Sequence, residues 1–163
     1  MMEAAKDSLR EALLRELKET EKFFDKSTSC LAEEDSVFAP QDGMFTVAQQ
    51  VAHVARTVEW FRDAMIRPEG FDMDFEKHWL EIKDIRSITE ARKRLHAAFE
   101  GMTSAIARMG EAELRSPFPV GPVMGGAPRF HAVGATVDHT AHHRGALTVY
   151  SRMLGKVPAM PYL

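Results

Sequence analysis

The sequence has little cysteine and no long apolar run. Cys30 is its single cysteine in 163 residues, so no disulfide can form within the chain. A chain of this kind suits a reducing compartment. No apolar run approaches the roughly 20 residues that a membrane-spanning helix needs, and the charged start MMEAAKDSLR lacks the apolar segment of a signal peptide. We therefore predict a cytoplasmic protein that makes no contact with membranes.

An excess of positive charge is also missing. The chain has 21 Lys and Arg against 24 Asp and Glu, for a net charge of −3 with neutral histidines. Because a nucleic-acid binder needs a basic face, this balance argues against general phosphate-backbone binding. Apolar residues make up 45% and charged residues 28% of the chain, which is typical of a folded globular protein. The length suits one domain, which we expect to span residues 1–163.

No segment shows convincing strand-like alternation, whereas four segments have helical periodicity. Thr46 with Gln49, and Ser87 with Glu90, match capping boxes that begin the second and third helices. Gly155 is placed to end the fourth helix. We predict an all-α, four-helix bundle. Its helices are expected at about residues 3–29, 46–67, 87–109 and 128–155.

The connections differ in character. Residues 68–85, PEGFDMDFEKHWLEIKDI, join the second and third helices and are long enough to cross the end of a bundle. Residues 32–45 are rich in turn-forming residues, and residues 116–128 contain too much Pro and Gly to be helical.

Three of the seven histidines lie in one five-residue stretch of the predicted fourth helix, residues 139–143. At ~100° per residue, His139 and His143 fall in the middle of the apolar face and His142 about 60° away, at its edge. Two imidazoles at positions i and i+4 converge above the helix surface, where a divalent metal would satisfy both. The alternative is that they hydrogen-bond to neighbouring helices, or lie at a wet end of the core, without a metal.

His53 is the candidate third ligand, from the second helix. The helical wheel places it on a stripe that is neither charged nor fully apolar, formed by Thr46, Gln50, Thr57, Trp60 and Ala64. Such a stripe suits the wall of a polar cavity, and equally an edge of the bundle at a subunit interface. His96 is expected to be solvated, and no pattern orients His78 in the long connection.

Two segments together, VAQQVAHVARTVEWF and HTAHHRGALTVYSRMLGK, resemble the DinB/YfiT-like family of metal-binding four-helix bundles. The resemblance covers about residues 5–157. It implies up-down-down-up connectivity, a homodimer, and one divalent cation held by His53, His139 and His143. It leaves His142 to support the ligands or to lie on the surface. The helical wheel turns Arg144 away from the site, so we expect it to have a structural or dimer-contact role.

The better-understood members of this family resemble thiol transferases that use bacillithiol, mycothiol or glutathione. The resemblance thus implies a metal-dependent transferase that joins a small electrophile to a thiol activated at the three-histidine site. A metal there could instead activate water for hydrolysis, or the protein could be a non-catalytic metal-binding or dimeric binding module. Imidazole ligands leave the metal open among Zn, Ni and Fe.

The sequence assigns no general acid or base. Asp138 precedes His139 but projects about 100° away from it. Trp60, Tyr150 and Met153 lie one or two turns from the ligands, where they would line a pocket for a small-molecule substrate or else pack in the core. Because free imidazole has a pKa of about 6.5, we expect metal affinity to fall steeply below about pH 6.

Overall fold

The computed structural model describes residues 8–163, and these residues are helical apart from their connections. The β-type pairing within this range is one isolated bridge, Pro117 to Pro128, so the predicted all-α class is confirmed. No helix in this part of the chain is long and apolar enough to cross a membrane. The long helices are α1 (Leu9–Thr28), α2 (Val47–Ile66), α4 (Ile88–Arg108) and α6 (His131–Met153); the short ones are η1 (Glu33–Asp35), α3 (Phe75–Leu80) and α5 (Glu111–Arg115).

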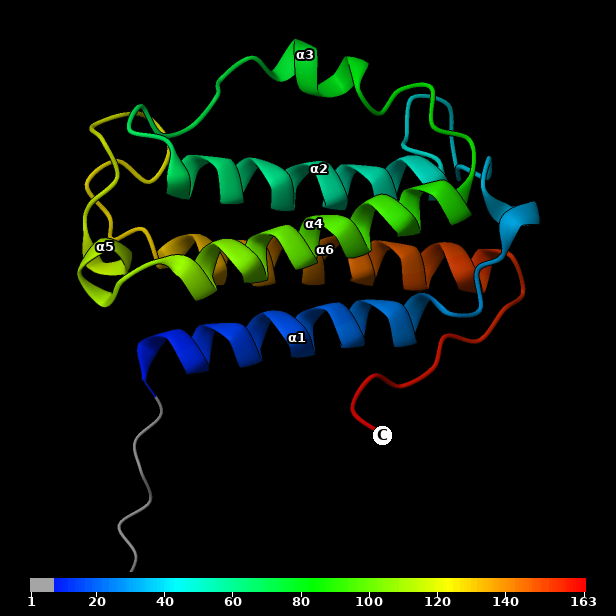
Figure 1. Cartoon of the computed structure of the whole chain (residues 1–163). Coiled ribbons are helices and arrows are strands. Elements are labelled where there is room, and N and C mark those ends of the chain that lie inside the picture. The colour runs from blue at the N-terminus through cyan, green and yellow to red at the C-terminus, as the bar shows by residue number, and fades with distance from the viewer. Residues whose placement is uncertain (1–7) are drawn as a thin grey trace, which may run out of the picture.

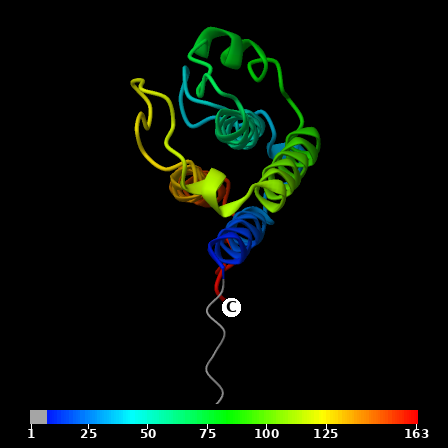
Figure 2. The same cartoon turned by 60° about the vertical axis from the view of Figure 1, so that its left-hand side comes forward.

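The four long helices have the expected up-down-down-up connectivity. α1 and α6 run in one direction, and α2 and α4 run in the other (Figure 1). Seen nearly end-on, α2 and α1 each pack between α4 and α6 (Figure 2). Because α2 and α4 are parallel, residues 67–87 cannot simply cross one end of the bundle. They return along the outside of α2, with α3 about halfway along (Figure 1).

Local signals place the helix ends close to their predicted positions. Thr46 Oγ1 accepts a hydrogen bond from the Gln49 amide at 3.2 Å, and Gln49 Oε1 accepts one from the Thr46 amide at 3.0 Å. Ser87 caps α4 by one bond only: its Oγ accepts from the Glu90 backbone N–H at 3.2 Å, and the return bond of the predicted capping box is not formed. Gly155 follows α6 with a φ of +74°. The first helix begins at Leu9, and residues 3–7 of its predicted span lie outside the described range.

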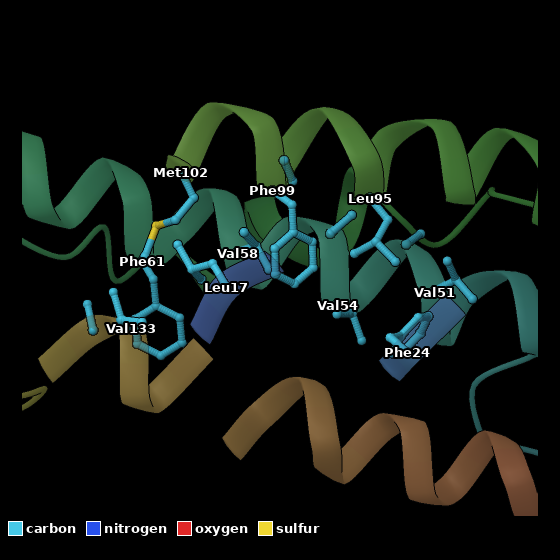
Figure 3. Packing of buried hydrophobic residues seen from close by; sticks show 14 of the residues in the cluster. Leu17, Phe24, Val51, Val54, Val58, Phe61, Leu95, Phe99, Met102 and Val133 are labelled. Atoms are coloured by element: carbon cyan, nitrogen blue, oxygen red, sulfur yellow. The ribbon is translucent and has the colours of Figure 1, made fainter. Parts of the chain in front are cut away.

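The core lies between the four long helices and determines which face of α2 remains for a site. Val51, Val54 and Val58 of α2 are buried among side chains of α1 and α4, including Phe24 and Phe99 (Figure 3). Each large side chain that is fully buried contributes about 1.5–3 kcal/mol. With this apolar face of α2 committed to the core, the neighbouring stripe that carries His53 faces α6 and the long crossover.

Arg129 connects the end of α2 to the start of α6. Its Nη1 donates to the carbonyls of Ala64, Met65 and Arg67 at 3.0, 2.9 and 3.3 Å. Carbonyls in the last turn of a helix have no partner within the helix. Arg129→Ala should therefore lower the free energy of unfolding by about 2 kcal/mol in urea titrations. Arg108→Ala, exposed on α4, is the control; equal losses in the two variants would contradict this role.

Candidate metal centre

Three histidines from α2 and α6 lie together on one side of the bundle. His53, His139 and His143 each offer a ring nitrogen, and these atoms lie within 4.8 Å of one another. The Nε2 atoms of His53 and His139 are 3.2 Å apart. Two nitrogens bound to a tetrahedral ion at 2.0–2.1 Å would be about 3.3 Å apart. The cluster therefore needs only small side-chain rotations to surround a single ion.

Helix geometry produces this convergence. His139 and His143 are one turn apart on α6, and their ring centroids are 4.6 Å apart. The ring of His53 lies 5.0 Å from that of His139 and 4.8 Å from that of His143. His142 is exposed on the surface beside His143, in agreement with its position on the helical wheel. That the three clustered histidines bind a metal remains a prediction.

Gln50 orients one of the three imidazoles. Its Oε1 lies 2.8 Å from Nδ1 of His143, and both side chains are buried. An amide oxygen can only accept, so Nδ1 must carry the proton and Nε2 is left free as the ligand atom. The sequence placed Gln50 on the His53 stripe but gave it no role, since the contact depends on how α2 packs against α6.

Burial keeps the clustered imidazoles neutral. Desolvation, followed by repulsion from neighbouring histidines, lowers the pKa of His139 to about 4 and the pKa of His143 to about 3. The pKa of His53 is also lowered, mainly by burial and then by His142. Because metals bind neutral imidazole, His139 and His143 stay in their ligand form well below pH 6.5. We therefore expect the steepest part of the fall in affinity at a lower pH than free imidazole would give.

The donor set fits a divalent transition metal. It consists of three neutral imidazoles, and no carboxylate or thiol among residues 8–163 belongs to the same cluster. Three imidazoles suit zinc, nickel or iron, and leave at least one coordination position for a further ligand.

A cavity of about 370 Å³ opens beside His53 and His139. This volume is near the lower end of the ~300–1,000 Å³ typical of small-molecule sites. Residues of α3 form part of its wall, so the long crossover contributes directly to the site. The other lining residues are Phe45, Arg56, Thr57, Trp60, Phe61, Phe75, His78, Trp79 and Ile82.

Two of the three predicted pocket residues lie near the cluster. Trp60 lines the cavity, and its indole nitrogen donates to the Asp72 carbonyl at 2.6 Å. Tyr150 is buried, and its hydroxyl donates to the Phe45 carbonyl at 3.2 Å. Tyr150 does not line the cavity; it lines a separate, more open depression together with Gln50 and His143.

The prediction that Met153 lines the pocket was wrong. Its side chain is 57% exposed and does not border the cavity. On the helical wheel Met153 lies only about 20° from His142, which is also exposed. That side of α6 faces solvent rather than α2.

Other residues considered from the sequence lie away from the cluster. Arg144 packs its guanidinium over Phe23 and Tyr162, at 5.8 and 6.0 Å from the ring centroids, which fits a structural role. His96 is exposed on α4, as expected. Cys30 is a free cysteine just after α1 and does not belong to the histidine cluster.

Two polar residues of the cavity wall received no role from the sequence. Arg56 Nε lies 2.8 Å from Glu81 Oε2, so its charge is already compensated. His78 Nε2 lies 3.6 Å from Asp72 Oδ2, and the His78 side chain is only 12% exposed. The sequence could not orient His78, because the path of the crossover is set by packing against α2.

Replacement of Gln50 should weaken metal binding without unfolding the bundle. Gln50→Leu keeps the bulk but removes the acceptor for His143, and should lower the affinity by about 10–100-fold. Gln50→Glu retains an acceptor oxygen and should bind at least as tightly as wild type. Competition titrations with a chromophoric chelator measure both, with exposed Gln41→Ala as the control. An unchanged affinity in Gln50→Leu would refute the orienting role.

An up-down-down-up bundle with a histidine cluster between its second and last long helices defines a class of metal-binding helical proteins. The sequence matches the profile of the DinB superfamily over residues 16–147, and the chain belongs to that superfamily. Its structure is similar to that of YfiT from Bacillus subtilis, with a TM-score of 0.71 and 19% identity, covering 96% of this chain and 94% of that one. YfiT is described as a probable metal-dependent hydrolase with an unusual four-helix bundle topology. No curated protein matches the sequence.

Proposed function

We propose that this protein is a divalent-metal-dependent enzyme that acts on a small electrophile, with His53, His139 and His143 as the metal ligands. The observation that carries the proposal is that His53 and His139 both line the cavity. A molecule in the cavity can therefore contact two of the three candidate ligands. A metal site with a purely structural role would have no need of such an opening.

Transfer to a low-molecular-weight thiol is the first candidate reaction. A bound ion would supply a positive charge that favours the deprotonated form of a thiol or of water. The chain itself orients His143 through Gln50 and holds the electrophile between aromatic walls. The thiol cosubstrate is proposed from the family resemblance, with bacillithiol, mycothiol and glutathione as candidates.

Hydrolysis is the second candidate, and two observations favour it. YfiT, which has a similar fold, is described as a probable metal-dependent hydrolase. In addition, Arg56 is paired with Glu81, so this arginine of the cavity wall is not free to bind the carboxylates of a peptide-like thiol.

One substrate separates the two reactions. Metal-loaded protein is incubated with p-nitrophenyl acetate, with and without each thiol, and the products are identified by mass spectrometry. In both reactions the acyl C–O bond breaks and p-nitrophenolate leaves. Transfer forms a C–S bond and gives a thioester and the one proton of the thiol, whereas hydrolysis forms a C–O bond and gives acetate and the two protons of water.

Metal-free protein and His143→Ala are the controls for the uncatalysed reaction. Thioester formed faster than in the controls identifies a transferase, and acetate formed faster without thiol identifies a hydrolase. Rates equal to the controls in every case would overturn the proposal. The chain would then be a non-catalytic metal-binding or dimeric binding module.

We further propose that the chain acts as a single domain, in the cytoplasm and as a homodimer. Exposed apolar side chains of α6, including Val149 and Met153, are available for contact with a second copy. Light scattering at micromolar concentration should give about twice the 18.3 kDa of one chain. A mass of 18.3 kDa would refute the dimer.

A further inference from the structure

We propose that the cavity beside His53 and His139 binds neutral, planar aromatic molecules, and that side chains of α3 select them. This inference deepens the proposed function, because it names the substrate class of the same site. It rests on the shape and charge of the cavity, and binding to the cavity can be measured without a metal.

Aromatic rings from three segments surround the cavity. Phe45 precedes α2, Trp60 belongs to α2, and Phe75 and Trp79 belong to α3. The rings of Phe45 and Trp79 lie nearly parallel, at 15° with centroids 5.8 Å apart. Trp60 lies edge-on to Phe75, at 60° and 5.9 Å. Because aromatic rings attract one another in offset-stacked and edge-to-face arrangements, a planar ligand ring would find favourable contacts on its faces and its edges.

The charged groups near the cavity are already compensated. Arg56 is paired with Glu81, which lies 3.0 Å from Arg94 as well. Arg94 in turn lies 2.7 Å from Glu59, so two arginines face two carboxylates. An anionic ligand would have to compete with Glu81 for Arg56. A cationic ligand would find no carboxylate among the described lining residues. In the metal-free protein the side chains of the cavity therefore favour a neutral molecule.

Helix α3 presents aromatic surface that packing has not used. None of its six residues is buried. Phe75 is 55% exposed and Trp79 is 43% exposed, although both line the cavity. A ligand that covers these rings would remove apolar surface from water, which favours binding. The residues that select the ligand thus belong to the crossover rather than to the helices that carry the histidines.

The probe for this inference is N-phenyl-1-naphthylamine, a neutral aromatic dye whose emission rises in apolar surroundings. It is titrated into protein freed of metal with a chelator. Thr57→Trp, which fills the cavity from α2, should raise the Kd at least tenfold. Trp79→Ala, which removes part of the wall, should raise it several-fold. Leu80→Ala is the matched control, because Leu80 is exposed on α3 and does not line the cavity.

The charge requirement is tested with 8-anilinonaphthalene-1-sulfonate, which has similar rings and one negative charge. We expect it to bind at least tenfold more weakly than the neutral dye. Circular dichroism confirms that each variant is folded. The inference is overturned if the neutral dye does not bind, if both cavity variants bind like wild type, or if the sulfonate binds as tightly. Dye binding without ester turnover would reject the proposed function and retain the aromatic site. Ester turnover without dye binding would retain the proposed function and reject the aromatic site.

Discussion

Alanine at His53, His139 or His143 is expected to lower the affinity for a divalent metal by more than 100-fold in each case. Loss of a residue that merely supports a ligand costs about 10–100-fold, and loss of a direct ligand should cost more. The three ring nitrogens lie within 4.8 Å of one another, and no carboxylate or thiol of the described chain belongs to the cluster to replace one of them. Competition of Zn²⁺ between each variant and a chromophoric chelator gives the affinities.

The control for these variants is His142→Ala, which removes a neighbouring but exposed imidazole. The metal affinity of this variant should stay within about twofold of wild type, because the His142 ring does not belong to the cluster. The opposite pattern, with His142→Ala losing the metal and His143→Ala retaining it, would show that the register assigned to α6 is wrong. Circular dichroism on every variant separates loss of a ligand from loss of the fold.

Metal affinity is expected to change little between pH 8 and about pH 6, and then to fall with increasing steepness at lower pH. Protons compete with the metal only when the pH approaches the pKa of a ligand. Burial lowers the pKa of His139 to about 4 and that of His143 to about 3. When the pH is below the pKa values of all three ligands, each bound ion displaces up to three protons. The affinity then falls by up to about 10³-fold for each unit of pH.

The same shifts destabilise the metal-free bundle in acid. In the unfolded chain these histidines have a pKa of about 6.5, so they take up protons that the folded state resists. The contribution of the neutral histidines to the free energy of unfolding is fully present above pH 6.5. It is lost as the pH falls toward the lowered pKa values of His139 and His143. Metal content and helicity are measured on the same dialysed samples from pH 3 to 8. Half-release at pH 6.5 or above, or full retention at pH 3, would contradict a site of one buried and two half-buried imidazoles.

The sequence predicted the helices well because helix formation depends on neighbouring residues. The capping box of Thr46 and Gln49 and the terminal Gly155 are local signals, and the structure contains both. The convergence of His139 and His143 is local as well, because one helical turn separates them. The up-down-down-up connectivity came from the resemblance to a family rather than from any local signal.

Features that depend on packing between distant segments could not be predicted. The contact of Gln50 with His143 joins residues 93 positions apart in the chain. Phe75, His78 and Trp79 reach the cavity only because the crossover returns along α2. The error at Met153 has a different origin, because the helical wheel itself places Met153 about 20° from His142, on the side of α6 that faces solvent.

Anomalous diffraction from crystals of the untagged, metal-loaded protein tests the three-histidine site most directly. We predict one peak per chain, about 2.0–2.1 Å from a ring nitrogen of His53, of His139 and of His143. At His143 the coordinating atom should be Nε2, with Nδ1 still bonded to Gln50. A peak at His142, a peak bound by carboxylates, or the absence of any peak at the cluster would contradict it.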